Sequence, residues 1–480
     1  MSAQPQQATP ALSETPPTLS RGLRQRHVTM IGFGGIIGAG LFVGSGAVIK
    51  QAGPAAVASY AIAGVLVILT MRMLGEMAVA RPTTGSFVEY SRAALGDWAG
   101  FVGGWLYWYF WVIVLAVEAI AGATIIQGWI PGLPLWLVSL CLMSVLTATN
   151  LASVRSYGEF EFWFASIKVA AIIVFAVIMI AALVGIVGGT GASASNLTSH
   201  GGFLPEGGVA VLSAVVSVMF AIIGGEIATI AAAESDSPAR AVARTTQLLA
   251  VRISVFYIAS VALIVMVLPW NDTEVGTSPF SAALAQVGIP ATDQIMNAIV
   301  LTAVLSCLNS GIYIASRMMF VLSGNGDAPK SMEKLNSRGV PVRAILAATA
   351  FGFLSVIAQA ISPDGIFQFL LNSSGVVVLL VYVMICGSEL VLRRRLERSD
   401  PEALTLKMWA FPYLTIAAMI GMVAVLVSML FIDEVRSQLY ASLGSAVVVL
   451  IAYRIVKSVR GPAAQHERDG VGVAHAISGS

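Results

Sequence analysis

Three ionisable side chains, Glu118, Lys168 and Glu226, lie within long apolar stretches of the sequence. An ionisable group at the centre of a membrane helix costs about 3 kcal/mol or more unless it is paired or faces a polar cavity. A buried carboxylate can bind an amine or carry a proton, and a buried ammonium can fill a cation site, so these residues predict recognition of a charged solute or proton handling. For Lys168 the alternative is an ammonium that reaches back to the inner membrane surface. For Glu226 it is a structural role in a helix break.

A glycine-rich segment, residues 31–46, reads IGFGGIIGAGLFVGSG. Each glycine in a helix costs about 1 kcal/mol relative to alanine, so this density needs a compensating role. One role is close packing of neighbouring helices through small residues. The other is an unwound centre near Gly38, Ala39 and Gly40, whose free backbone N–H groups would bind an anion such as a carboxylate.

A second glycine-containing break favours the unwound interpretation. Residues 219–230 read MFAIIGGEIATI, and place Ile223, Gly224, Gly225 and Glu226 near the middle of another apolar stretch. This stretch is the sixth along the chain, five after the first. In inverted-repeat transporters the first helix of each half is discontinuous, and the two unwound centres meet at the membrane midplane to form the substrate site.

The composition predicts an all-α integral membrane protein. The chain is 57% hydrophobic and only 11% charged, whereas soluble domains average about 45–50% and 25%. Apolar stretches of about 20 residues are long enough to cross a bilayer. We predict about twelve transmembrane helices, near 28–49, 54–75, 98–124, 133–150, 161–185, 209–233, 247–269, 294–322, 342–360, 366–391, 410–431 and 436–457.

The distribution of positive charge predicts the orientation. Of the 27 Lys and Arg residues, all but Lys50 and Arg436 fall on one side when the predicted spans alternate. Positively charged loops stay in the cytoplasm, so both termini are expected there. We predict one transporter domain at residues 21–457. Residues 1–20 are expected to form a disordered cytoplasmic tail before it, and residues 458–480 a second cytoplasmic tail after it. Within that domain we expect repeat one at about 28–185, repeat two at about 209–391 and two extra helices at about 410–457.

Other features exclude several functional classes. The net charge of +2 and the absence of a basic stripe argue against a nucleic-acid partner. No nucleophile–base pairing or cofactor motif stands out, so we predict neither an enzyme nor a bound cofactor. Cys141, Cys307 and Cys386 lie in apolar stretches, which predicts small buried side chains and no disulfide or metal site.

Polar residues elsewhere in the spans suggest local contacts. Arg72 and Glu76 lie one helical turn apart and predict a structural or gating ion pair. Two further groups could contact substrate or ions, or only bridge neighbouring helices. They are Ser306, Asn309 and Ser310 in the eighth span, and Asn372, Ser373, Ser374 and Gly375 in the tenth.

The sequence resembles the amino acid, polyamine and organocation superfamily, in its bacterial amino acid transporter branch, over nearly its whole length. The segments that carry the resemblance are RGLRQRH at 21–27, IGAGLFVGSG at 37–46, PTTGSF at 82–87, EFEFW at 159–163 and SCLNS at 306–310. Within this branch, residues 225–235, 306–317 and 326–329 are most similar to the 4-aminobutyrate (GABA) permeases.

The resemblance implies a leucine-transporter-type fold with a 5+5 inverted repeat and discontinuous helices one and six. It also implies proton-coupled import of an amino acid across the bacterial inner membrane. By this resemblance the backbone at Gly38, Ala39 and Gly40 holds the substrate carboxylate, and residues 223–226 face the amine. Lys168 stands where sodium-coupled relatives hold an ion, and Glu118 and Glu226 are the carboxylates available for proton coupling.

The sequence departs from the GABA permeases within Gly224-Gly225-Glu226-Ile227-Ala228, because Gly and Ala stand at positions where those permeases carry Thr and Val. We therefore keep three hypotheses. The first is import of GABA or a related ω-amino acid with protons, and the second is a permease of the same family for other amino acids. The third is a channel or an amino acid sensor. The sequence makes no prediction about oligomeric state.

Overall fold

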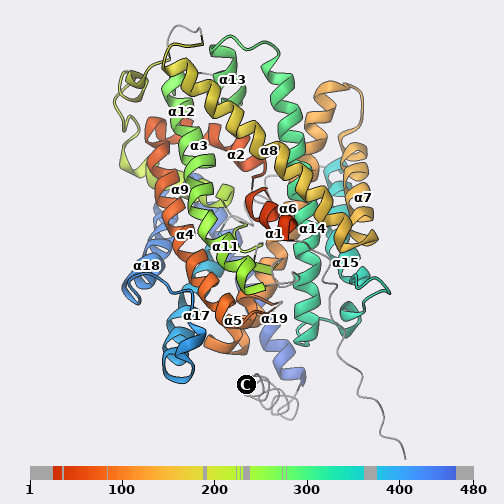
Figure 1. The fold of residues 1–480 in the computed structure, drawn as a ribbon. Coiled ribbons are helices and arrows are strands. Elements are labelled where there is room, and N and C mark those ends of the chain that lie inside the picture. The colour runs from red at the N-terminus through yellow and green to blue at the C-terminus, as the bar shows by residue number, and fades with distance from the viewer. Residues whose placement is uncertain are drawn as a thin grey trace, which may run out of the picture.

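The computed structural model describes residues 25–460, except 35–36, 84, 188–191, 223, 228, 231–237, 273, 277 and 362–375. Within these residues every regular element is a helix, which confirms the predicted all-α class. The long helices run side by side and form a single bundle (Figure 1). Of the predicted tails, residues 1–20 and 461–480 lie outside the described residues, whereas 458–460, the start of the predicted tail at 458–480, still belong to a helix that ends at Arg460.

Eight stretches of the described chain are long and apolar enough to cross a membrane. They are Gly40–Ala80, Asp97–Trp129, Leu135–Ala152, Val154–Leu183, Val242–Val267, Thr292–Gly324, Tyr413–Phe431 and Val435–Ser458. Two shorter apolar helices cover Gly207–Met219 and Val342–Ala358. All of these overlap predicted spans. In the predicted tenth span, 366–391, residues 366–375 are not described and residues 377–391 belong to a helix that covers Val377–Ser399.

The predicted first span is divided into short helices, as its glycine content suggested. Helix α1 (Gln25–Gly34) ends before the interruption, and α2 (Ala39–Phe42) and α3 (Gly44–Ala52) follow it. A 3₁₀ turn, η1 (Gly53–Ala55), leads into α4 (Ala56–Ala80). The apolar stretch from residue 40 to 80 would measure about 60 Å if it were straight, roughly twice a hydrocarbon core, so the turn divides it into two shorter elements.

The sixth predicted span is also interrupted. Helix α9 (Gly207–Ile222) is followed by Gly224, whose φ of 115° lies in a region that favours glycine over residues with a side chain. Helical structure is present again at Ile227. The chain then continues through α11 (Pro238–Arg252), a π-helical segment η3 (Ile253–Ala259) and α12 (Ser260–Val267).

Two long helices form the centre of the bundle, α6 (Asp97–Trp129) and α14 (Thr292–Gly324), which pack against each other. The most apolar windows of these helices are 67% and 72% buried, whereas those of α18 (Tyr413–Ser428) and α19 (Asp433–Arg460) are only 28% and 17% buried. The outer helices therefore leave much of their apolar surface uncovered by protein. A lipid environment, in which apolar side chains need no protein cover, explains this arrangement.

The other helices surround this centre. They are α5 (Phe87–Leu95), α7 (Leu135–Ala152), α8 (Val154–Leu183), α13 (Pro279–Gln286), α15 (Val342–Ile361) and α17 (Val377–Ser399). Short 3₁₀ segments connect them, namely η2 (Ala194–Leu197), η4 (Glu274–Gly276), η5 (Lys330–Glu333), η6 (Pro401–Ala403) and η7 (Met429–Phe431).

The η4 segment lies directly against α3. A methyl group added to Gly46 would lie 2.4 Å from the Val275 carbonyl oxygen, which is closer than such atoms approach. Carbon atoms of the Lys50 side chain fill the corresponding space beside Gly276. The second half of the interrupted first span therefore makes backbone-to-backbone contact with this loop.

Candidate functional site

The interruption of the first span faces α6 and α14. A methyl group at Gly38 would lie 3.1 Å from Glu118 Oε1 and 3.4 Å from Cys307 Sγ. Ile37 and Gly38 are not helical, whereas Ala39 and Gly40 begin α2, so only Gly38 of the predicted 38–40 centre lies in the interruption. The space at Gly38 is thus bordered by a carboxylate and a thiol.

Glu118 is buried, with 7% of its surface exposed, and its Oε2 atom has no hydrogen-bond partner among the described residues. A buried carboxylate oxygen without a donor is unfavourable, so it calls for a ligand or a proton. An amine placed beside Gly38 would supply the missing donor. The structure therefore brings two of the predicted site residues, Gly38 and Glu118, next to each other.

Gly40 connects the two interrupted spans. A methyl group at Gly40 would lie 3.0 Å from the Ala221 Cα atom, at the end of α9. The hydroxyl group of Tyr257 donates to the Ala221 carbonyl at 3.2 Å, which satisfies one of the carbonyls left free where a helix ends. Tyr257 belongs to the π-helical segment η3, and such segments often occur at functional sites.

Glu226 lies in the second interruption and is completely buried. Two tyrosine hydroxyls donate to its carboxylate, Tyr107 to Oε1 at 3.0 Å and Tyr382 to Oε2 at 2.8 Å. The buried Arg252 guanidinium lies within electrostatic range of the same carboxylate. Glu226 therefore joins the span-six break to α6 and α17.

The other predicted residues of this break are only partly described. Ile223 lies outside the described residues. Gly225 faces α4, because a methyl group there would lie 2.8 Å from Met71 Sδ. The predicted Asn372–Gly375 cluster also lies outside the described residues.

Lys168 is fully buried in the middle of α8, and its side chain does not reach the surface of the protein. The helix begins at Val154 rather than at the predicted 161, which places Lys168 about 20 Å from its start. Its Nζ atom donates to the Ile37 carbonyl at 2.9 Å and to Ser306 Oγ at 2.8 Å. Through these two hydrogen bonds, Lys168 links the interrupted part of the first span to α14.

Three residues that hydrogen-bond to predicted polar residues were not singled out from the sequence, namely Tyr107, Tyr382 and Glu161. Glu161 is fully buried and accepts a hydrogen bond from Ser306 at 2.6 Å. Its spacing of seven residues from Lys168, which is two helical turns, was a usable signal. The tyrosines offered none, because each lies more than 100 residues from Glu226 in sequence.

The remaining polar residues of α14 bridge neighbouring helices. Asn309 Oδ1 accepts from Asn150 Nδ2 at 2.9 Å, and the Ser310 and Tyr157 hydroxyls lie 3.3 Å apart. Of the three cysteines, Cys307 and Cys386 are buried as predicted, whereas Cys141 is exposed. Cys141 lies on α7, an outer helix, where an apolar side chain need not be covered by protein.

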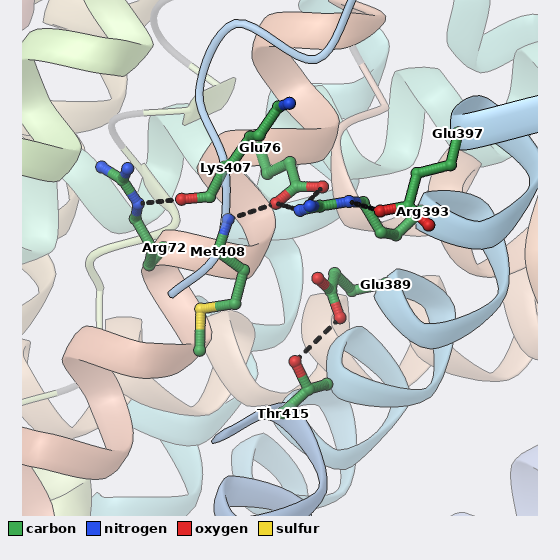
Figure 2. A network of polar contacts seen from close by, with 8 residues as sticks. All are labelled: Arg72, Glu76, Glu389, Arg393, Glu397, Lys407, Met408 and Thr415. Atoms are coloured by element: carbon green, nitrogen blue, oxygen red, sulfur yellow. Dashed lines mark hydrogen bonds and ion pairs between the residues drawn. The ribbon is translucent and has the colours of Figure 1, made fainter. Parts of the chain in front are cut away.

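The predicted ion pair between Arg72 and Glu76 is wrong, because Glu76 pairs with Arg393 instead. Arg393 Nη1 lies 2.8 Å and 2.7 Å from the two carboxylate oxygens of Glu76. Arg72 donates from Nε to the Lys407 carbonyl at 2.9 Å. Figure 2 shows both arginines at the segment that joins α17 to α18, whose Met408 N–H also donates to Glu76.

This network predicts a large loss of stability for R393M. The Arg393 and Glu76 side chains are 9% and 1% exposed, and removing one partner of a buried pair costs about 3–5 kcal/mol because it leaves the other charge uncompensated. The thermal denaturation temperature in detergent should therefore fall. R394M is the matched control, because Arg394 is the exposed neighbour in the same arginine run and should leave this temperature unchanged.

The double variant R393M with E76M completes the test. Removing both charges should recover most of the lost stability, since replacing a buried pair by apolar residues is often neutral. A single variant R393M that unfolds at the wild-type temperature would contradict this assignment of the pair.

Comparison with known proteins gives a consistent result. A family model described as amino acid permease matches residues 27–462. A gamma-aminobutyric acid permease of Bacillus subtilis is 52% identical over 440 residues, which are 92% of this chain and 94% of the relative. A gamma-aminobutyric acid permease of Escherichia coli is 46% identical over 87% of this chain and 90% of its own. An aromatic amino acid transport protein of Corynebacterium glutamicum is 42% identical over 92% and 96%.

Proposed function

Because this chain belongs to the amino acid permease family, we propose that it imports GABA or a related ω-amino acid together with protons. The family consists of transporters rather than enzymes, and the chain is a multi-pass membrane protein. The predicted resemblance to amino acid transporters is thereby confirmed. The observation that carries the choice of substrate is the 52% identity to a GABA permease over nearly the full length of both proteins.

The proposed architecture has twelve transmembrane helices in a leucine-transporter-type 5+5 inverted repeat. Repeat one is about 28–185, repeat two about 209–391, and two extra helices follow at about 410–457. The non-helical residues 37–38 and 224–226 support it, because they fall in the first span of each proposed repeat. The charge distribution supports a bacterial inner-membrane orientation with both termini and the tails at 1–20 and 458–480 in the cytoplasm.

In the proposed substrate site, the carboxylate of the amino acid binds backbone N–H groups near Gly38, Ala39 and Gly40. The ammonium group lies at Glu118 or at residues 223–226. The unpartnered Oε2 of Glu118 favours Glu118 as the amine acceptor, because both oxygens of Glu226 already accept tyrosine hydroxyls. Glu226 then has the different role of holding the span-six break against α6 and α17.

Proton coupling is proposed to involve Lys168, Glu118 and Glu226. The charged Lys168 ammonium occupies a site between the first-span interruption and α14, in which a monovalent cation would also fit chemically. A resident ammonium makes a second cation unnecessary there, which supports protons rather than sodium as the coupling ion. In alternating access, the site that has bound the amino acid and the proton from one side of the membrane then opens to the other side and releases both there.

A permease for other amino acids is the second candidate. The 42% identity to an aromatic amino acid transport protein, with nearly complete coverage of both chains, supports it. Within residues 224–228, GGEIA, Gly and Ala stand where the resemblance to GABA permeases implies Thr and Val, and this difference at the break also favours another substrate. A channel or sensor is the remote alternative, and currents far above carrier turnover would favour a channel.

The decisive experiment measures uptake of labelled GABA into liposomes that contain the purified protein, with an inward proton gradient. Unlabelled amino acids serve as competitors. We expect gradient-driven uptake that ω-amino acids block more effectively than α-amino acids. Uptake of an α-amino acid without uptake of GABA would contradict the proposed substrate, and uptake that ignores the gradient would contradict proton coupling.

A further inference from the structure

Glu161 is a fully buried carboxylate that the proposed substrate site does not use. It lies on α8 seven residues before Lys168, so both side chains emerge from the same face of the helix. Long side chains on a helix lean toward its N-terminus. Lys168 therefore extends back along α8 toward Glu161.

Ser306 of α14 connects the two side chains. Lys168 Nζ donates to Ser306 Oγ at 2.8 Å, and Ser306 Oγ donates to Glu161 Oε1 at 2.6 Å. Both hydrogen bonds run in the same direction, from the ammonium through the hydroxyl to the carboxylate. All three groups are completely buried, so bulk water does not compete with this path.

We propose that Glu161 is the proton acceptor of Lys168 and that Ser306 relays the proton between them. In this step the Lys168 N–H bond breaks and its proton bonds to Ser306 Oγ, while the Ser306 hydroxyl proton bonds to Glu161 Oε1. The lysine becomes a neutral amine, the glutamate a neutral acid, and the serine is regenerated. The inference rests on the proposed proton coupling and identifies where the coupled proton goes.

The transfer has a direction along the membrane. Glu161 lies about 10 Å from the start of α8 and Lys168 about 20 Å, so the proton moves toward the end that the charge distribution assigns to the cytoplasm. Asn309 and Ser310 lie beside the Glu161 carboxylate. Tyr157, one turn nearer the helix start, lies 3.3 Å from Ser310 through its hydroxyl. Polar groups therefore continue from Glu161 toward the inner end.

The same step changes the contact with the first span. Lys168 Nζ also donates to the Ile37 carbonyl, and hydrogen bonds from a charged donor are roughly twice as strong as those from a neutral one. Deprotonation of Lys168 weakens this contact at the interruption of the helix. The other titratable groups that act on Lys168 are Glu118 of α6 and Cys307 of α14, both of which border Gly38. The location of the proton, on Lys168 or on Glu161, thus affects the hydrogen bond to Ile37, which lies next to Gly38 in the proposed substrate site.

The test compares two assays on E161Q, which keeps the shape of the side chain and an oxygen for Ser306 but cannot take the proton. In the exchange assay, liposomes loaded with unlabelled GABA exchange it for external labelled GABA at equal pH on both sides. In the accumulation assay, empty liposomes take up labelled GABA under an inward proton gradient. We expect E161Q to retain exchange but to lose accumulation by about 10²-fold, the typical effect of losing a positioned proton-transfer group. S306A, which leaves both titratable groups in place, should behave in the same way.

E159Q is the matched control, since Glu159 lies on the same helix, has a third of its side chain exposed and pairs with Arg26. It should retain both activities. Accumulation by E161Q or S306A at the wild-type level would overturn the relay, and equal loss of exchange and accumulation in both would assign the residues a structural role only. If E161Q does not insert, S306A alone decides. A wild-type protein whose accumulation ignores the gradient would instead overturn the proposed proton coupling.

Discussion

Replacement of Glu226 by Gln is expected to reduce uptake by about 10²-fold while the protein still inserts and elutes as a folded species. The Glu226 carboxylate accepts one hydroxyl from Tyr107 and one from Tyr382, and hydrogen bonds to a charged group contribute about 1.5–3 kcal/mol each. A glutamine offers one oxygen, and its amide group cannot accept from the second tyrosine. A free-energy loss of about 1.4 kcal/mol corresponds to a tenfold change. Losing one such hydrogen bond together with the charge therefore accounts for the expected reduction of about 10²-fold in uptake.

The measurement is initial uptake of labelled GABA in liposomes, normalised to reconstituted protein. Y107F and Y382F each remove one donor but keep the charge, so each should cost about tenfold. E206Q, a neutralised carboxylate on an exposed segment, serves as the control and should transport normally. Wild-type uptake by E226Q would remove this carboxylate from the mechanism.

Replacement of Lys168 by Ala is expected to abolish accumulation driven by a proton gradient and to destabilise the protein. The substitution leaves Glu161 buried without its cation and the Ile37 carbonyl without this donor. An uncompensated buried charge costs about 3–5 kcal/mol, so the denaturation temperature in detergent should fall. The double variant K168M with E161L removes both charges and should regain stability without regaining gradient-driven accumulation.

The double variant separates the two roles of Lys168. Recovery of stability alone is the expected result, because apolar replacements can fill the space but cannot carry a proton. K168A with the accumulation and gradient dependence of the wild type would limit this lysine to a structural role.

The sequence was sufficient to predict the positions of most helices that the structure describes, and that two apolar stretches are interrupted. Hydrophobic length and glycine position are local properties, and both interruptions fall at predicted glycine-rich segments. The start of α8 was predicted too late, because residues 154–160 include polar side chains that a hydropathy argument assigns to a loop. Here Tyr157 is buried against Tyr313 of α14, with the two rings stacked 4.1 Å apart.

Side-chain partners were the least predictable part of the site. The spacing of Arg72 and Glu76 favoured a local pair, yet Arg393 approaches both oxygens of Glu76 from a position 317 residues away. Which arginine pairs with Glu76 depends on how the helices pack against each other. The spacing of residues within one helix carries no information about that packing. The tyrosines that donate to Glu226 escaped prediction for the same reason.

The contact between Gly46 and the Val275 carbonyl limits how the molecule can move. There is no space for a single methyl group at this point, so a rotation or slide of α3 that brings a side chain against η4 would require that loop to shift. We therefore expect the two segments to move together. A spectroscopic label attached to the loop would then report the motion of the interrupted first span without modifying that span itself.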